Sequence, residues 1–369
     1  MSDPASLRPD KRARLHEGVV IPAHPLALTA ERTLDARRQA ALTRYYLAAG
    51  AGGVAIGVHT TQFGIRDVPG LYREVLTIGA ETVATTPVAQ PVLIIAGVVG
   101  PTRQAVAEAE LAASLGYDMV LVGLGGLSDW SDDQLVAHIR EITRVLPVFG
   151  FYLQPSVGGR PLGYGFWRAV AEVPGVAAIK IAPFNRYWTL DVVRAVAESS
   201  RRDEIALYTG NDDNILADLL TTYRFVVDGR PVEKRIVGGL LGHWAVWTHT
   251  AVQLLAACHR AVQRTDGALL ARLLQLNAAV TDANAAIFDP QHAFAGCIPG
   301  IHEVLRRQGL LEGRWCLDPH EELSPGQLEE IDRVCAAYPE LTDDAFVRAH
   351  LDAWLSARRD DAVAPRPRA

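Results

Sequence analysis

Lysine is nearly absent from this 369-residue chain: it occurs three times, as Lys11, Lys180 and Lys234, against 33 arginines. An arginine side chain stays protonated and is a poor nucleophile, whereas a desolvated lysine can lose its proton near neutral pH and attack a carbonyl group. Lys180 lies in the apolar run 176–182. A lysine at the end of a buried strand either forms a Schiff base or extends its charge to the solvent.

Cysteine is also scarce, and its four residues form no CxxC pair. This scatter argues against a zinc site or a disulfide framework and is typical of reduced thiols in a cytoplasmic protein. The longest apolar stretch, 238–258, contains two histidines and a glutamine, so it does not read as a membrane span. The first residues lack the apolar core of a secretory signal. We therefore expect a cytoplasmic protein without a membrane partner.

An excess of positive charge is absent as well. The net charge is −6 and the isoelectric point is about 6.0. No basic stripe carries interleaved aromatic residues, which excludes nucleic acid as an expected partner. His243 and His249 lie six residues apart among aromatic residues, a pattern that favours core or interface packing over metal binding.

Short β-branched runs alternate with longer amphipathic stretches over residues 18–241. The candidate strands are 18–23, 53–58, 92–98, 119–122, 148–153, 177–181, 205–209 and 235–241. Helical spacing occurs between most of them, for example in 34–49, 103–115, 132–144 and 190–199. Eight buried strands that alternate with helices predict the α/β class and a closed (β/α)8 TIM barrel. An open nucleotide-binding sheet would need a glycine-rich loop after its first strand, where this chain has Pro22-Ala23-His24-Pro25.

Four parts of the chain are distinguished by composition. Residues 1–17 are expected to be loosely ordered, 18–250 to form the barrel, 251–357 to form a C-terminal helical extension, and 358–369 to form a flexible tail. The weakest barrel unit is 223–234, which is polar and irregular. The extension is expected to pack on the barrel or on a neighbouring subunit.

Polar groups recur just after predicted strands, where TIM barrels carry their reactive residues. His59-Thr60-Thr61 follows the second strand, Tyr152 lies near the end of the fifth, and Lys180 lies at the end of the sixth. Gly210-Asn211-Asp212-Asp213 follows the seventh. This shared placement favours Lys180 as a nucleophile and Tyr152 as a proton-transfer group over two core residues. Thr60-Thr61 and Asp212-Asp213 are open between capping a helix and binding a ligand.

These motifs resemble those of the dihydrodipicolinate synthase and N-acetylneuraminate lyase family of pyruvate-dependent class I aldolases. The resemblance extends over about residues 18–310. The matching stretches are His59-Thr60-Thr61 for the family's Gly-Thr-Thr, Phe151-Tyr152-x-x-Pro155 for the tyrosine strand, Gly175 to Lys180 for the lysine strand, and Gly210-Asn211-Asp212 for the following loop.

The resemblance implies an enzyme in which Lys180 forms an imine and then an enamine with pyruvate or another 2-oxo acid. It implies Tyr152 as proton shuttle and Thr60, Thr61, Gly210 and Asn211 as substrate-binding residues. His59 replaces a small family residue and is either a further proton-transfer group or a gap filler. The family pattern implies no metal and no cofactor beyond the covalent imine, an aldehyde as a candidate second substrate, and a homo-oligomer, either a dimer or a tetramer.

Three departures limit the resemblance. Val157 stands where dihydrodipicolinate synthases carry an arginine, and Arg160 is nearby. The stretch 122–127 lacks the tyrosine pair of those enzymes. The family's glutamate after Gly-Thr-Thr-Gly is also replaced, since this chain continues with Gln62 and Phe63 after the threonines. We therefore expect a related aldolase or lyase rather than a lysine-pathway dihydrodipicolinate synthase. The alternatives are a sugar-acid dehydratase of the same superfamily, a non-catalytic barrel that binds 2-oxo acids, and a phosphate-binding barrel that uses the glycines of 238–242.

Overall fold

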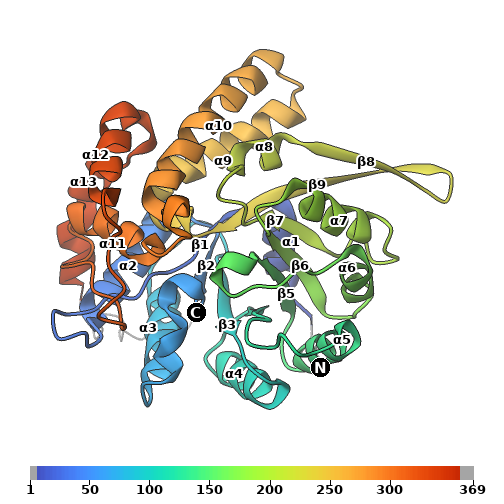
Figure 1. The fold of residues 1–369 in the computed structure, drawn as a ribbon, viewed down its shortest axis with the longest axis horizontal. Helices are drawn as coiled ribbons and strands as arrows, with labels where there is room; N and C mark the ends of the chain where they lie inside the picture. Colours follow the sequence, from blue (N-terminus) through green and yellow to red (C-terminus); the bar gives the residue numbers. More distant parts are fainter. Residues whose placement is uncertain (1–5, 358–369) are drawn as a thin grey trace, which may run out of the picture.

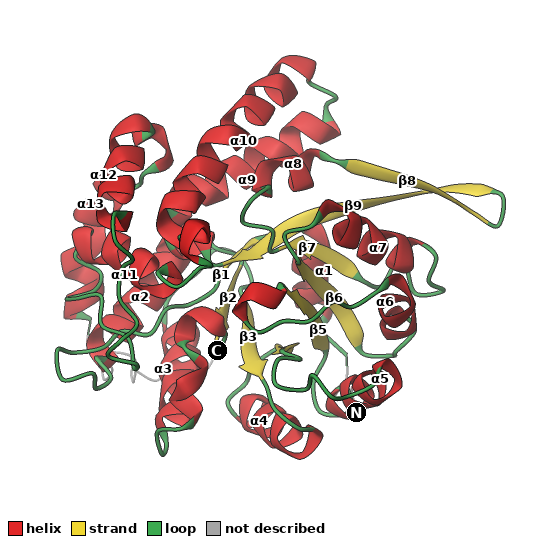
Figure 2. Cartoon of the chain, viewed as in Figure 1, coloured by secondary structure: helices red, strands yellow, loops and turns green. Residues whose placement is uncertain are grey.

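Eight parallel strands form a nearly closed barrel in a computed structural model that describes residues 6–357 (Figures 1 and 2). The barrel strands are β1 (Val20–Pro22), β2 (Gly53–Ile56), β3 (Leu93–Val98), β4 (Met119–Val122), β5 (Val148–Leu153), β6 (Val176–Ala182), β7 (Ala206–Thr209) and β9 (Arg230–Leu241). Their order is β1-β9-β7-β6-β5-β4-β3-β2, and a bridge between Ala23 and Ala55 joins the ends. The predicted (β/α)8 barrel is confirmed.

Helices connect consecutive barrel strands and cover the outside of the barrel (Figure 2). They are α2 (Ala36–Ala49), α3 (Leu71–Thr85), α4 (Thr102–Ser114), α5 (Asp132–Ile142), α6 (Tyr164–Ala171), α7 (Arg186–Ala197) and α8 (Ile215–Leu220). Polar side chains cap several N-termini: Asp35 accepts from the Arg38 amide and Ser131 from the Gln134 amide. Such caps satisfy amide groups that the first helical turn leaves unpaired.

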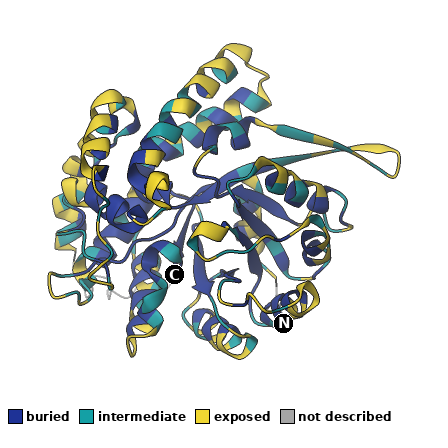
Figure 3. Cartoon of the chain, in the orientation of Figure 1, coloured by how far each residue is buried: buried dark blue, intermediate teal, exposed yellow. Residues whose placement is uncertain are grey.

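The barrel strands, apart from the first half of β9, which pairs with β8, are buried on both of their faces (Figure 3). Side chains that point into the barrel, such as Phe149, Ala178 and Tyr208, form one apolar cluster. The alternate side chains, such as Ile179 and Ile181, pack against the surrounding helices. Parallel strands that are covered on both faces carry continuous apolar runs, which is the pattern found in the sequence.

A helix closes the amino-terminal end of the barrel. α1 (Pro9–Glu17) buries Leu15 completely, and the Lys11 ammonium donates to the Asp118 carboxylate over 2.9 Å and to the Val92 carbonyl. The expectation that 1–17 is loosely ordered is wrong for the helical part, because its few apolar residues have a barrel floor to pack on. Residues 1–5 lie outside the described part of the chain.

A β-hairpin occupies the crossover that the sequence left irregular. β8 (Thr222–Val227) pairs antiparallel with the first half of β9 and extends beyond the helical layer (Figure 1). Its turn consists of Asp228 and Gly229, both with positive φ. A two-residue turn of this kind matches the twist of the flanking strands, so polar, alternating residues form a ribbon there instead of a loop.

The remaining helices form the predicted C-terminal extension. They are α9 (Thr248–Gln263), α10 (Gly267–Phe288), α11 (Cys297–Arg307), α12 (Gln327–Ala337) and α13 (Asp344–Ser356). α10 packs on α8 and α13 packs on α2, so the extension lies along one side of the barrel (Figure 1). Residues 358–369, the predicted tail, lie outside the described part. Within residues 6–357, no helix has the length and apolarity needed to cross a membrane.

Candidate active site

The carboxyl ends of the barrel strands open into a cavity. Its lining comes from β5 and β6, from the segments that follow β1, β2, β5, β6, β7 and β9, and from the region between the end of α10 and the start of α11. The cavity therefore lies where (β/α)8 enzymes carry out their chemistry.

Lys180 projects into this cavity from β6. Its side chain is on the same strand face as Ala178 and Ala182, and its Nζ atom lies 4.3 Å from the centre of the Phe151 ring. In the described part of the chain, no residue accepts a hydrogen bond from Nζ. Burial lowers the pKa of Lys180 from 10.5 to about 8, and the nearby charge of Asp212 acts in the opposite direction. An appreciable fraction of neutral, nucleophilic amine is therefore present near neutral pH.

Asp212 is the acidic group of the cavity. It lies in the loop after β7, is 5% exposed, and accepts a hydrogen bond from the His243 amide over 3.2 Å. Burial raises the pKa of the Asp212 carboxyl group, and the Lys180 charge opposes that shift. Two buried groups whose pKa values converge in this way can exchange a proton during a reaction. The sequence had left Asp212 open between a cap and a ligand contact.

Gly210 permits the close approach of this loop to the lysine. A Cβ atom at this position would lie 2.6 Å from Lys180 Cε and 2.8 Å from Ala182 Cβ. The Gly210 amide donates to the Ile181 carbonyl over 2.7 Å, which fixes the loop to β6. Gly210 is thus in the cavity wall, as its place after the seventh strand predicts, and substrate binding by its backbone stays a prediction.

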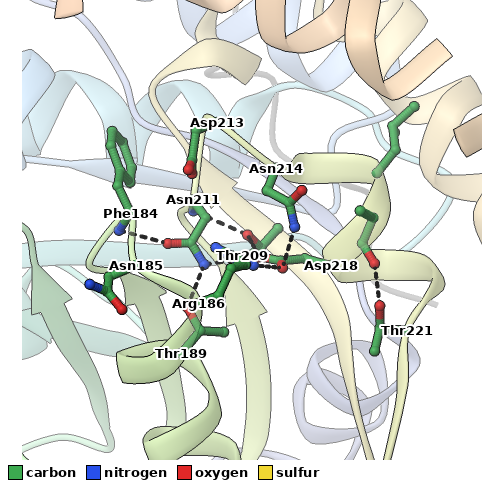
Figure 4. Close-up of polar contacts among 12 residues, drawn as sticks. Phe184, Asn185, Arg186, Thr189, Thr209, Asn211, Asp213, Asn214, Asp218 and Thr221 are labelled. Carbon is green, nitrogen blue, oxygen red and sulfur yellow. Dashed lines mark hydrogen bonds and ion pairs between the residues drawn. The ribbon is translucent and has the colours of Figure 1, made fainter. Parts of the chain in front are cut away.

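Asn211 points away from the cavity, so its predicted place in the substrate site is wrong. Figure 4 shows its amide in a polar network between two loops: Oδ1 accepts from the Phe184 amide over 3.0 Å. Nδ2 donates to Thr189 Oγ1 over 3.2 Å and to Asp218 Oδ2 over 2.9 Å. Asp218 also accepts from Thr209 over 2.7 Å. The network fixes the loops that carry Asp212 and Phe184.

Tyr152 lies on the outer face of β5, so the predicted catalytic placement is wrong. Its ring lies between Trp167 of α6 and Trp188 of α7, with ring centres 5.4 and 5.9 Å away, and its hydroxyl accepts from the Leu162 amide over 3.0 Å. Phe151 is the residue paired with Lys180 across the strands and directed into the cavity. Tyr152 has the family's Tyr-x-x-Pro spacing, but in this chain the tyrosine at that position points to the outer face of β5 and not into the cavity.

The short helix η1 (His59–Thr61) forms another part of the cavity wall. Thr60 lines the cavity while its hydroxyl donates to the Ala23 carbonyl over 2.8 Å. Thr61 is completely buried; its hydroxyl donates to the His24 carbonyl over 2.6 Å and accepts from the Gly57 amide over 3.0 Å. The Thr61 side chain therefore does not reach the cavity, and it instead ties η1 to β1 and β2.

His59 lies in the cavity near the lysine. Burial and, to a smaller extent, the Lys180 charge together lower the pKa of His59 to about 4. The imidazole is therefore neutral at physiological pH. Both roles considered for His59, a proton-transfer group and a gap filler, agree with this position, since a neutral imidazole can fill space and can also accept a proton.

Arginine is absent from the described cavity wall. Val157 lines the cavity at the place where the resemblance predicts an arginine in dihydrodipicolinate synthases. Arg160 lies nearby, but its Nη1 atom donates to the carbonyls of Leu127 (3.1 Å) and Trp130 (2.8 Å) and so ties two loops together. Lys180 is the single Lys or Arg side chain among the described lining residues. Within residues 6–357, no group of His, Cys, Asp or Glu could hold a metal ion.

Sequence patterns did not reveal the remaining cavity residues. Phe184 follows β6, Phe288 ends α10, and Phe294 and Cys297 come from the segment that leads into α11. No motif marks these positions, and the helical extension had been assigned only a packing role. The single available signal was the position of Phe184 just after a barrel strand. Burial raises the pKa of the Cys297 thiol well above its usual value, so this cysteine is not a thiolate nucleophile.

No protein-family model matches the chain. Two curated relatives, DapA-like lyases from strains R1 and NRC-1 of Halobacterium salinarum, are each 31% identical over 182 residues. The match covers 48% of this chain and 58% of each relative, so the chain spans little more than half the length of these proteins.

Solved structures share the fold over most of the chain. N-acetylneuraminate lyase from Fusobacterium nucleatum, solved with pyruvate, superposes with a TM-score of 0.68 at 15% identity, covering 89% of this chain and 99% of that one. Dihydrodipicolinate synthase from Oceanobacillus iheyensis has the same score and coverages at 16% identity. The enzyme from Acinetobacter baumannii, solved with pyruvate, scores 0.67 at 16% identity, covering 89% and 99%. The predicted resemblance to this family is confirmed, and at these identities it shows the fold.

Proposed function

We propose that this protein is a Schiff-base-forming lyase that joins or cleaves pyruvate, or another 2-oxo acid, and an aldehyde. The observation that carries the proposal is the position of Lys180. Its amine is buried, has no hydrogen-bond acceptor in the described part of the chain, and faces a largely apolar cavity. The likeness to DapA-like lyases and to barrels solved with pyruvate supports this reading. No cofactor is required, because the imine itself supplies the electron sink.

The reaction begins when neutral Lys180 attacks the ketone carbon of the 2-oxo acid. Loss of water leaves a protonated imine, which withdraws electrons from the adjacent carbon. Removal of a proton from that carbon produces an enamine, and the enamine carbon attacks the aldehyde carbonyl. Hydrolysis of the new imine releases the 4-hydroxy-2-oxo acid and restores the amine. Cleavage follows the same steps in reverse.

Proton transfer is assigned to Asp212 rather than to a tyrosine. The family resemblance implied Tyr152, but its hydroxyl is on the outer side of β5 and contacts the Leu162 amide. Asp212 lies in the same cavity as Lys180 and is electrostatically coupled to it. A carboxyl group whose pKa is raised by burial suits both the removal and the return of a proton near neutral pH. His59 is a second acceptor in reach of the cavity.

The dehydration of a sugar acid has less support. Such a substrate carries several hydroxyl groups that must find polar partners when buried. The polar side chains of the described wall are few, and Thr60 already donates to the Ala23 carbonyl. A phosphorylated substrate is also disfavoured: Cβ atoms at Gly238 and Gly239 would lie 2.6 Å from Tyr208 and 2.5 Å from Trp244, so side chains pack closely against these glycines.

Borohydride reduction in the presence of pyruvate tests the proposal. We expect a stable adduct of one pyruvate, measured by intact mass and located on Lys180 by peptide mapping. The control is built into the chain, because Lys11 and Lys234 are its other two lysines and both donate to backbone carbonyls. Failure of pyruvate and of longer 2-oxo acids to label Lys180 would refute the mechanism and leave a non-catalytic binding barrel. Dimer or tetramer formation stays a prediction.

A further inference from the structure

Four phenylalanine rings surround the cavity beyond the lysine. Phe151 comes from β5, Phe184 from the loop after β6, Phe288 from the end of α10, and Phe294 from the segment between α10 and α11. Phe184 and Phe294 meet edge to face, with ring centres 5.7 Å apart and an angle of 62° between their planes. Segments separated by more than a hundred residues thus place two rings against each other in the wall.

Both of these rings are held on a left-handed backbone. Phe184 has φ +51° and Phe294 has φ +68°, values that bulky residues rarely adopt. The Phe184 amide is fixed by the Asn211 side chain over 3.0 Å. The Phe294 amide donates to the Asp289 carbonyl over 2.9 Å, and the Asp289 carboxylate accepts from Ser324. Unfavourable backbone conformations persist where the surrounding structure enforces them, and they cluster at functional sites.

The charges of the cavity restrict the second substrate further. In the enamine that attacks the aldehyde, the Lys180 nitrogen carries no positive charge, and the other ionisable acid or base of the described wall besides His59 is the Asp212 carboxyl group. A second substrate with a carboxylate or phosphate would therefore be buried without a cationic partner. A polyhydroxylated aldehyde would find only His59, Thr60 and Gln154 as uncharged polar side chains in the described wall, whereas four phenyl rings offer no hydrogen-bond partner. An aromatic ring can instead pack with the existing rings in offset or edge-to-face contact.

We propose that the aldehyde partner is aromatic, and that Phe184 and Phe294 select it by packing on its ring. This inference rests on the proposed Schiff-base function. In the forward direction the enamine carbon forms a bond to the aldehyde carbon, and the aldehyde oxygen takes a proton from the cavity. Water then hydrolyses the imine. The sum is pyruvate plus an aromatic aldehyde to a 4-aryl-4-hydroxy-2-oxobutanoate, with no oxidant or reductant required.

Substrate competition provides the first test. The wild-type protein would be given pyruvate together with one aldehyde at a time: benzaldehyde, glyceraldehyde or succinic semialdehyde. Product formation would be followed by chromatography and mass spectrometry. We expect kcat/KM for benzaldehyde to exceed the values for both other aldehydes at least tenfold. A higher value for the hydroxylated or the carboxylate-bearing aldehyde would overturn the aromatic assignment.

Substitutions at the two rings provide the second test. Asparagine tolerates a left-handed backbone, so Phe184→Asn and Phe294→Asn remove the ring without adding backbone strain. We expect each to lower kcat/KM for benzaldehyde at least tenfold and to leave the rate of pyruvate trapping on Lys180 unchanged. Phe294→Leu, which keeps an apolar side chain, should retain more activity. Phe225→Asn on β8, outside the cavity, is the matched control.

The two proposals fail in different ways. If neither pyruvate nor any longer 2-oxo acid labels Lys180, the Schiff-base function is refuted and the aromatic assignment with it. If pyruvate labels Lys180 but the asparagine variants turn over benzaldehyde as well as the wild type does, the chemistry stands and the role of the two rings is refuted. A thermal melt of each variant separates loss of selectivity from loss of fold.

Discussion

Lys11 and Lys180 are buried to the same extent, each 8% exposed, at opposite ends of one barrel. At the floor, the Lys11 ammonium donates to the Asp118 carboxylate and to a backbone carbonyl. At the mouth, which is the end of the barrel where the strands have their carboxyl ends, Lys180 faces the Phe151 ring and has no hydrogen-bond acceptor within the described chain. Equal burial therefore has different consequences: an ion pair and a hydrogen bond hold Lys11 in place, whereas Lys180 lacks a hydrogen-bond acceptor and burial lowers its pKa to about 8.

The same contrast applies to the two ends as a whole. The floor is closed by α1, and the hydroxyl of Tyr208 donates to the Leu15 carbonyl over 2.9 Å and accepts from the Val19 amide over 3.2 Å. At the mouth, Lys180 and Asp212 line the cavity, and Phe184 and Phe294 are held on a left-handed backbone. In this barrel, the floor contributes stability and the mouth is available for chemistry.

The largest effect is expected from Lys180→Met. Without the amine, trapping of pyruvate should disappear and kcat should fall at least about 10³-fold, as for other residues that form a covalent intermediate. Thermal stability should be kept, since a buried amine without a hydrogen-bond partner is replaced by an apolar side chain. Lys180→Arg is the control that retains the charge without the nucleophile. Full activity of either variant would show that the mouth lysine is no different from the one at the floor.

Asp212→Asn should have the next largest effect, through proton transfer. We expect kcat to fall about 10²–10⁴-fold, the usual contribution of a general acid or base, while pyruvate trapping continues. Imine formation needs neutral Lys180, so its rate in the wild type should rise with pH through about 8. Because the Asp212 charge raises the pKa of Lys180, its removal should shift this rise to lower pH. Trapping rates measured across a pH series check this, and an unshifted profile would contradict the coupling.

Lys11→Met, at the floor of the barrel, should have the opposite effect: a loss of stability with activity kept. It leaves the Asp118 carboxylate, with a 12% exposed side chain, without its ion-pair partner. Breaking a buried pair from one side costs about 3–5 kcal/mol of unfolding free energy. Urea denaturation should show this loss while kcat of the folded protein stays unchanged. The double variant with Asp118→Asn should recover part of the stability. If Lys11→Met lowered kcat while the protein kept its full stability, the conclusion that the floor contributes only stability would be wrong.

Tyr152→Phe should have the smallest effect. It removes a hydroxyl that accepts from the Leu162 amide on the outer face of β5. Leaving that amide unpaired costs about 1–3 kcal/mol in stability, and kcat should stay within about threefold of wild type because the ring lies outside the cavity. Steady-state kinetics decide the point. A fall in kcat of the size expected for Asp212→Asn would return Tyr152 to the role that the family resemblance implied.

The sequence alone determined the barrel and singled out Lys180 as the candidate nucleophile. Eight β-branched runs matched the eight barrel strands closely, because parallel strands buried on both faces leave continuous apolar stretches. Lys180 was identifiable because a lysine in such a stretch is chemically exceptional in a chain with so few of them. The loop after β7 was also located from the sequence, and within it Asp212 rather than Asn211 lines the cavity.

Tertiary structure alone decided which residues surround that lysine. The run Phe149 to Leu153 is apolar on both faces, so it carries no alternation that tells which residues point inward. Pairing with β6 places Phe151 beside Lys180 and turns Tyr152 outward. Phe294 comes from a segment more than a hundred residues away, and α1 packs on the barrel floor, which is built from distant strands. Such contacts depend on which distant surfaces meet, and local residue patterns do not encode that.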